Sequence, residues 1–184
     1  MVRLLVLTLA LGVSSAAVTT STVPASAASC RVTWGSLAKS QPAFTGKQVT
    51  NVRSGRHACF DRLVIDINGH GPGTPGYSVR YVRTVHKDGS GAVVALRGGA
   101  KLLVVVNAPS YDESGYLTYR SPSETNLVDV TGYRTFRQVA WAVSFEGQTS
   151  IGLGVRARLP MRTLLLASPG GGHRLVVDVA HSWS

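Results

Sequence analysis

The sequence predicts an all-β protein, because short strand-like segments recur along the chain and no long stretch has a helical period. The segments are rich in Val, Leu, Ile and Tyr and are separated by Gly, Pro, Asn and Asp, which favour turns. No stretch longer than about ten residues repeats its apolar side chains every 3.6 positions. Nine segments are predicted as strands: residues 48–53, 63–68, 77–85, 92–96, 101–107, 136–145, 149–155, 161–167 and 174–180.

The first residues have the pattern of a cleavable secretion signal. Arg3 precedes an apolar run over residues 4–13, and small residues lead to Ala25-Ser26-Ala27-Ala28, a pattern that signal peptidase reads. A membrane anchor is the alternative, but this run is about half of the roughly 20 residues that a bilayer-spanning helix needs. We therefore expect residues 1–28 to be removed, leaving an exported protein with no transmembrane segment after signal cleavage.

The two cysteines, Cys30 and Cys59, follow the predicted signal. An even number of cysteines in an oxidising compartment favours a disulfide. Closing a loop of about 30 residues should stabilise the fold by roughly 3–4 kcal/mol. In the alternative interpretation Cys30 carries a lipid, but Ala27-Ala28-Ser29 lacks the usual aliphatic residue three positions before the cysteine, and Cys59 would be left unpaired. A disulfide would tie an N-terminal lead, residues 29–47, to the domain that follows.

Glycine-containing turns connect several predicted strands. Asp88-Gly89 predicts a tight hairpin between segments 77–85 and 92–96, because both residues tolerate positive φ. Gly98-Gly99 allows a turn before segment 101–107, and the Ser-Pro-Gly-Gly-Gly run at 168–172 allows one before segment 174–180. No helix follows these glycines to direct its N-terminus at an anion, so none of the loops is predicted to hold phosphate.

Two segments show the period-2 alternation of a half-buried strand. We expect both alternating sets to be core: Leu63, Ile65 and Ile67 in the first, and Val139, Trp141, Val143 and Phe145 in the second. Trp141 is therefore interpreted as a packing residue rather than a platform for a sugar ring, because its neighbours on the same face are apolar.

An internal repeat links two of the predicted strands. Residues 62–67 (RLVIDI) match residues 174–179 (RLVVDV) in residue class at every position. A duplication of two halves of one sandwich would explain the match, and chance similarity between two ordinary strands is the alternative. In either case Asp66 and Asp178 fall on the face opposite the aliphatic side chains, so each is predicted to pair with a neighbouring Arg rather than to act as a catalytic acid.

A long connection runs from residue 108 to residue 135 with no sustained strand pattern. It is polar and carries Tyr111, Tyr116, Tyr119 and Tyr133. Loops of this length in a compact domain are usually functional or mobile, and tyrosine offers a flat apolar face suited to stacking on sugar rings. The alternative is that this connection folds back over an exposed sheet edge.

The charge of the chain favours anionic partners. Removal of Arg3 with the signal lowers the formal net charge from +10 to +9, which attracts anions at long range. Nucleic acid is disfavoured as a partner, because the chain is predicted to be exported and its basic residues are scattered. Anionic wall polymers, acidic glycans and lipid headgroups suit the location better, and the alternative is that the charge only maintains solubility.

Several short pieces follow one another in a characteristic order: residues 59–64 (CFDRLV), 75–77 (PGY), 79–82 (VRYV), 145–147 (FEG), 152–155 (GLGV), 160–162 (PMR) and 174–179 (RLVVDV). This order resembles the AMIN-like domains of exported proteins in high-GC bacteria, over roughly residues 48–181. The resemblance implies a β-sandwich of two sheets related by approximate duplication, which makes residues 48–184 an AMIN-like β domain, and the predicted segments give this sandwich about eight or nine short strands. It also implies a role in attaching exported proteins to the cell wall, and it supplies no catalytic residues.

The sequence does not predict an enzyme. His57, Cys59 and His70 are residue types of a metal site, but a disulfide would consume Cys59 and no second close-spaced ligand pair completes the set, so no metal or cofactor is expected. Ser90 lies in a predicted hairpin turn rather than at the strand-to-helix elbow of a hydrolase serine. Asp61 and Glu146 are carboxylates that a glycosidase would need, but the sequence marks no cleft around either.

The leading hypothesis is a non-catalytic module that binds the cell envelope, with a cell-wall glycan or anionic wall polymer as its partner. Its candidate ligand-binding residues are three tyrosines for stacking on sugar rings and three arginines for attracting carboxylates or phosphates: Tyr111, Tyr116, Tyr119, Arg156, Arg158 and Arg162. Arg156 and Arg158, two positions apart in an extended segment, are expected to point the same way. The alternatives are a secreted module that binds another exported protein by strand addition at an open sheet edge, and a small hydrolase.

Overall fold

A computed structural model describes residues 30–183, so the predicted signal over residues 1–28 lies outside the described part. Its strands are β1 Lys39–Gln41, β2 Gln48–Arg56, β3 Phe60–Asn68, β4 Tyr77–Val82, β5 Val85–His86, β6 Val93–Val94, β7 Ala100–Val106, β8 Phe136–Phe145, β9 Gln148–Val155, β10 Met161–Ala167 and β11 His173–Ala180, with a 3-10 turn η1 at Pro169–Gly171. Each of the nine predicted segments contains a strand. β1 was not predicted, and β5 and β6 are much shorter than the segments predicted there.

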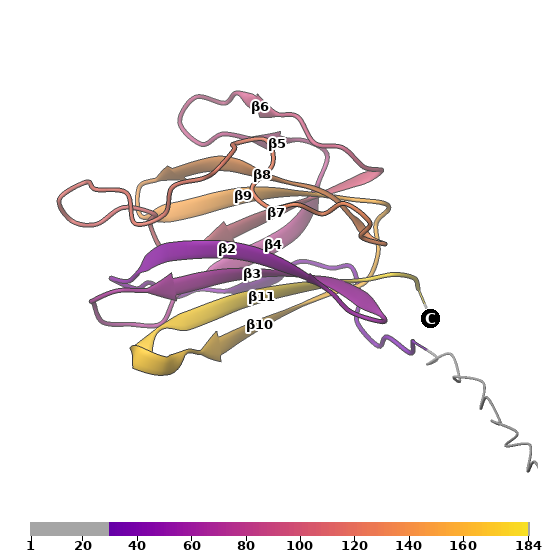
Figure 1. Cartoon of the computed structure of the whole chain (residues 1–184), viewed down its shortest axis with the longest axis horizontal. Coiled ribbons are helices and arrows are strands. Elements are labelled where there is room, and N and C mark those ends of the chain that lie inside the picture. The colour runs from indigo at the N-terminus through magenta and orange to yellow at the C-terminus, as the bar shows by residue number, and fades with distance from the viewer. Residues whose placement is uncertain (1–29, 184) are drawn as a thin grey trace, which may run out of the picture.

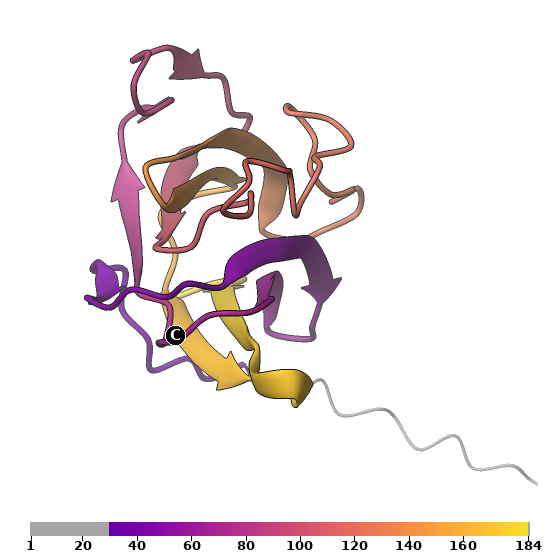
Figure 2. The same ribbon diagram turned by 90° about the vertical axis from the view of Figure 1, so that its left-hand side faces the viewer.

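Two antiparallel sheets stack face to face (Figure 1). One sheet has five strands in the order β1-β4-β7-β9-β8, and the other has four in the order β10-β11-β3-β2. Turned by 90°, the two layers lie one above the other, and the β5–β6 hairpin lies outside the five-stranded sheet (Figure 2). The predicted all-β, two-sheet architecture is confirmed.

The four-stranded sheet is built from two hairpins, β2–β3 and β10–β11, which pair through β3 and β11. The two similar segments therefore lie side by side in one sheet, with Arg62 opposite Asp178 and Arg174 opposite Asp66. The expectation that this repeat relates one sheet to the other is wrong for these strands, because they are antiparallel neighbours. The predicted arginine partners are confirmed: Asp178 accepts from Arg62 and Arg162, and Asp66 accepts from Arg53.

The core fills the space between the sheets. The side chains of Leu63, Ile65 and Ile67 are fully buried there, as predicted from their alternation. In β8 the alternation is interrupted by irregularities between Phe136 and Gln138 and between Trp141 and Val143. These shift the later side chains off the core face. Val139 is buried and Trp141 packs partly buried against the core. Val143 is only half-buried and belongs to neither core cluster, and Phe145 is 46% exposed, so the prediction of these two as core residues is wrong.

The Asp88-Gly89 turn closes a hairpin that is much shorter than predicted. β5 pairs with β6 over two residues each, and Gly89 has the positive φ of 80° that the turn requires. Residues 77–82 pair instead with β1 and β7, so their expected pairing with segment 92–96 is wrong. The reason is a second small core, in which Val85 and Val94 pack on Ala140 and Ala142 of β8 and pull the hairpin onto the outer face of the five-stranded sheet.

Two glycines of β9 allow the chain to cross this face closely. A Cβ at Gly154 would lie 2.0 Å from the carbonyl oxygen of Arg97, and one at Gly152 would lie 2.8 Å from Leu96 Cδ1. Only glycine leaves room for the segment between β6 and β7, which therefore lies against β9.

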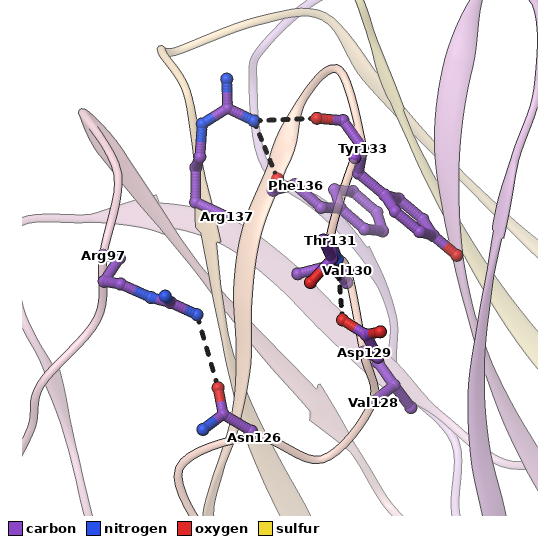
Figure 3. A pocket seen from close by; sticks show the side chains of 10 residues that line it. Arg97, Asn126, Val128, Asp129, Val130, Thr131, Tyr133, Phe136 and Arg137 are labelled. Carbon is purple, nitrogen blue, oxygen red and sulfur yellow. Dashed lines mark hydrogen bonds between the residues drawn. The ribbon is translucent and has the colours of Figure 1, made fainter.

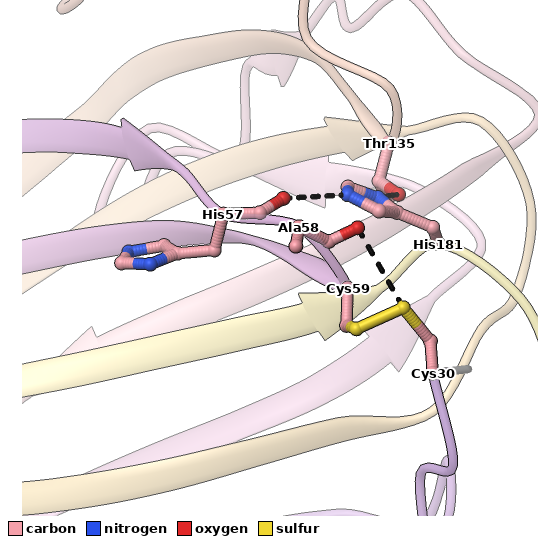
Figure 4. The surroundings of a disulfide bond; sticks show 6 residues. All are labelled: Cys30, His57, Ala58, Cys59, Thr135 and His181. Atoms are coloured by element: carbon pink, nitrogen blue, oxygen red, sulfur yellow. Dashed lines mark hydrogen bonds between the residues drawn. A yellow bond between two sulfur atoms is a disulfide. The ribbon is translucent and has the colours of Figure 1, made fainter. Parts of the chain in front are cut away.

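The predicted disulfide between Cys30 and Cys59 is present, with a Cα–Cα distance of 5.3 Å (Figure 4). It anchors the lead at the start of β3. A sulfur in a disulfide is not available for a lipid, so the structure supports a disulfide at Cys30 rather than lipid attachment. The lead then contributes β1 to the edge of the five-stranded sheet, so its described part, residues 30–47, is partly built into the domain. Between residues 30 and 183 no helix has the length and apolarity to cross a bilayer.

Candidate functional site

The connection from residue 108 to residue 135 runs along the outer edges of both sheets. The Val49 N–H of β2 donates to Pro109 O at 2.7 Å. On β8, the Trp141 N–H donates to Glu124 O at 2.7 Å, and Leu127 N–H donates to Val139 O at 2.8 Å. The connection thus covers the edge strands β2 and β8, which agrees with the alternative prediction that it folds back over an exposed sheet edge.

A short turn within this connection presents two apolar side chains to solvent. Asp112 Oδ1 accepts hydrogen bonds from the N–H groups of Ser114 and Tyr116, each at 2.9 Å, and Tyr111 and Leu117 form an isolated β-bridge. Tyr116 and Leu117 are 74% and 56% exposed. Their exposure is therefore held by a hydrogen-bonded turn rather than by a loose loop.

A cleft of about 380 Å³ lies between this connection and β8. Tyr111, Tyr119 and Trp141 line it, and the rings of Tyr119 and Trp141 lie 5.6 Å apart with an interplanar angle of 40°. Trp141 packs against the core, as expected, and also lines the cleft. Two of the three predicted tyrosines therefore share one site, together with a tryptophan that was assigned to packing alone.

Polar side chains complete the cleft. Lys87 Nζ and Glu124 Oε2 form an ion pair at 2.9 Å, and Arg120, Ser110, Ser121 and Ser144 also line the cavity. Burial raises the pKa of the Tyr119 hydroxyl above its ordinary value of 10.0. The cleft thus offers aromatic faces beside donors and acceptors of hydrogen bonds. Flat aromatic faces with polar tips suit the apolar faces and hydroxyl groups of sugar rings.

The AMIN-like domain model matches residues 47–181. The chain belongs to the AMIN-like domain family. The match confirms the resemblance found in the sequence and includes every strand from β2 to β11. It leaves out Cys30 and β1, so the disulfide joins this AMIN-like domain to a segment outside the matched residues. Comparison with curated proteins and with solved structures gave no match.

The three predicted arginines of the AMIN-like domain do not line the cleft. Arg162 donates to Asp178 at 2.8 Å, and its guanidinium lies 4.2 Å from the ring centre of Trp34. Arg158 donates to Ser36 Oγ at 3.2 Å and lies over the ring of Tyr81, and Arg156 donates to the carbonyl of His181. Arg156 and Arg158 lie between the end of β9 and the start of β10, away from the residues that line the cleft. Arg162 already has the carboxylate of Asp178 as its partner.

Sequence reasoning missed several residues that line the cleft of the AMIN-like domain. Trp141, Lys87, Arg120 and Glu124 were not predicted there, and Tyr116 was predicted but is not among the lining residues. A usable signal was the position of Trp141 on a strand that borders the long aromatic connection. Lys87 gave no signal, because only the folding of the β5–β6 hairpin onto β8 brings it to the cleft.

Proposed function

We propose that this AMIN-like domain is a non-catalytic, exported module that binds a cell-wall glycan in the cleft between the 108–135 connection and β8. The observation that carries the proposal is the grouping of Tyr111, Tyr119 and Trp141 around one cavity beside polar side chains. Family membership supports an envelope role, and the disulfide between Cys30 and Cys59 is consistent with an oxidising, extracellular location.

The chemistry of the cleft favours binding over hydrolysis. Among the described residues that line it, Glu124 is the sole carboxylate, and its partner is Lys87. A glycosidase commonly requires two carboxyl groups about 5–10 Å apart across the scissile bond. The cleft therefore has the means to hold a sugar and lacks the usual pair for cleaving it.

The test compares two tyrosine variants for binding to soluble peptidoglycan fragments, measured by calorimetric titration, and to purified cell walls, measured by co-sedimentation. Tyr111→Ala removes a lining ring and should weaken binding by roughly tenfold, the order of one aromatic stacking contact. Tyr116→Ala removes an equally large ring that is 74% exposed and outside the cleft, so it should leave fragment affinity within about twofold. Absence of wild-type binding at low salt, or equal losses in the two variants, would overturn the proposal.

Strand addition by another exported protein is the second candidate function, and the position of β10 favours it. β10 is the outer strand of the four-stranded sheet, and the 108–135 connection covers the opposite edge of that sheet. Replacing Thr163 or Leu165 by Pro would block pairing at this edge without touching the cleft. If these variants no longer capture an exported protein that the wild type captures, but still bind peptidoglycan fragments, strand addition would be favoured over glycan binding.

A further inference from the structure

Basic side chains gather at the end of the sandwich that carries the disulfide. β4 and β9 end there and β7 and β8 begin there, because Val82 pairs with Lys101, and Val155 pairs with both Ala100 and Phe136. Arg56 ends β2 at the same place. We define the basic end by eight residues: Arg56, Arg83, Arg97, Lys101, Arg134, Arg137, Arg156 and Arg158.

None of these eight cations has an ion pair with any residue between 30 and 183. Two carboxylates lie close to them: Asp61 is only 1% exposed, and Asp129 is exposed. At the opposite end the cations Lys47, Lys87 and Arg120 lie among the carboxylates of Asp112, Glu113 and Glu146, and Lys87 is paired with Glu124. Positive charge is thus concentrated along the strand direction towards one end, a distribution that solubility alone does not require.

Two depressions at the basic end lie between cations. The first, of about 480 Å³, is lined by Arg97 and Arg137 together with Asn126, Asp129 and Thr131 (Figure 3). Arg137 donates to the carbonyls of Tyr133 and Phe136, which holds its guanidinium in place at the wall of the depression.

The second depression, of about 390 Å³, is lined by Arg83, Lys101 and Arg158 around Tyr81. Arg97 borders the first depression and Gly99 borders the second, so the short segment between β6 and β7 joins them. A chain-like ligand that crosses this segment would meet cations in both depressions.

We propose that the basic end binds a linear polymer that carries phosphate groups, such as a phosphate-bearing wall polymer. Seven of its eight cations are arginines, whose guanidinium forks match oxyanions. The cations reach each depression from separate segments of the chain. A tetrahedral phosphate presents oxygens in several directions and can contact guanidinium groups from two sides at once.

This inference extends the proposed function by giving the AMIN-like domain a second, separate contact with the envelope. Arg137 and Ser144 lie seven residues apart along β8, which corresponds to about 23 Å in an extended strand. The glycan cleft and the basic end therefore engage different parts of a wall, and each can fail without the other.

The experiment titrates the exported protein with sodium polyphosphate over a salt series, with polygalacturonate as the carboxylate probe and dextran as the neutral one. The wild type should bind polyphosphate most tightly and lose affinity steeply as salt rises. The triple variant Arg83→Gln/Arg97→Gln/Arg134→Gln removes three basic-end charges that hold no ion pair, and it should bind at least roughly tenfold more weakly with a shallower salt dependence.

The matched control, Lys39→Gln/Lys47→Gln/Arg80→Gln, removes the same number of charges outside the basic end and should stay within about threefold of the wild type. Equal losses in the two triple variants, equal affinity for polygalacturonate, or no polyphosphate binding at low salt would overturn the inference. Tyr111→Ala should retain polyphosphate binding, so failure of the glycan cleft and failure of the basic end give different results.

Discussion

The carboxylate of Asp61 joins the two sheets through the backbone of Thr135, whose N–H donates to Asp61 Oδ2 at 2.6 Å. The next N–H, that of Phe136, donates to the same oxygen at 2.9 Å. Asp61 belongs to β3 and is 1% exposed, while Phe136 begins β8 in the other sheet. A buried acceptor thus fixes where the long connection ends and β8 begins.

The Thr135 side chain completes this junction. Ala180 N–H donates to Pro160 O at 2.9 Å, but proline has no N–H with which to return the bond. Thr135 Oγ1 donates to the Ala180 carbonyl at 3.0 Å and so supplies the missing donor. His181 Nδ1 lies 3.0 Å from the same hydroxyl, which ties the end of β11 to the start of β8 (Figure 4).

Removing the Asp61 carboxylate should destabilise the domain strongly. Asp61→Ala leaves two buried N–H groups without an acceptor, and we expect a loss of about 2–5 kcal/mol in the free energy of unfolding. Asp61→Asn keeps one acceptor oxygen and should cost about half as much. Denaturant unfolding followed by tryptophan fluorescence measures both values, and equal losses of less than about 1 kcal/mol would contradict this role.

Asp178 should depend on both of its arginine partners. Its side chain is fully buried and accepts from Arg62 at 2.7 Å and from Arg162 at 2.8 Å. Asp178→Ala leaves two partly buried guanidinium groups uncompensated and should cost about 3–5 kcal/mol. Arg53→Ala, which removes the more exposed ion pair with Asp66, should cost less than about 1 kcal/mol. Urea denaturation of both variants tests the ranking, and a reversed order would refute it.

Breaking the disulfide should lower stability without changing the fold. Cys30 and Cys59 are 29 positions apart, and opening a loop of about this size should cost roughly 3–4 kcal/mol. For a domain of this size the melting temperature should fall by about 10 °C on reduction. The Cys30→Ser/Cys59→Ser variant should melt at the lowered temperature and be insensitive to reductant. A wild-type melting temperature unaffected by reductant would show that the bridge does not constrain the domain.

Tyr81 should make the domain sensitive to alkali. Its hydroxyl donates to Leu159 O at 2.8 Å and accepts from Leu159 N–H at 2.9 Å, and burial raises the pKa of Tyr81 above 10.0, although the hydrogen bond and Arg158 oppose the shift. Because the pKa of Tyr81 is higher in the folded state than in the unfolded state, its protonated hydroxyl contributes fully to stability below the ordinary pKa of tyrosine. This contribution is lost as the pH rises through the raised pKa.

The stability of the wild type should therefore fall as pH rises from about 10, the ordinary pKa of tyrosine, up to the raised pKa of Tyr81, and that of Tyr81→Phe should fall less over the same range. Phenolate absorbance of the six tyrosines gives an independent measurement. Tyr81→Phe should remove a late-titrating step and leave the early ones unchanged. Loss of an early step instead would place the Tyr81 hydroxyl in solvent.

Much of the fold could be predicted because its signals are local. Leu63, Ile65 and Ile67 alternate along one strand, and every strand built on such a pattern forms close to its predicted position. The failures occurred where packing between distant segments decides the outcome. Phe145 lost its core position to irregularities in β8, and residues 77–82 paired with β7 rather than with the segment just beyond the Asp88-Gly89 turn.

The candidate site was only partly predictable for the same reason. The tyrosines of the 108–135 connection are visible in the sequence, but which of them face a cavity depends on how the connection lies along β8. Tyr111 and Tyr119 line the cleft, whereas Tyr116 projects into solvent from the turn that Asp112 stabilises. Likewise, nothing in the sequence around Arg162 predicted that its guanidinium would be paired with Asp178.

The sequence by itself determined that this chain forms antiparallel strands, that Cys30 and Cys59 pair and that the domain is AMIN-like, because strand period, cysteine number and the order of short motifs are properties of the chain alone. Tertiary structure decided which side chains meet. Trp141 reaches Tyr119 only because the 108–135 connection lies along β8, and Arg97 and Arg137 line one depression only because the segment between β6 and β7 crosses the five-stranded sheet. Contacts between residues far apart in the chain arise from packing of whole elements, and no local pattern encodes them.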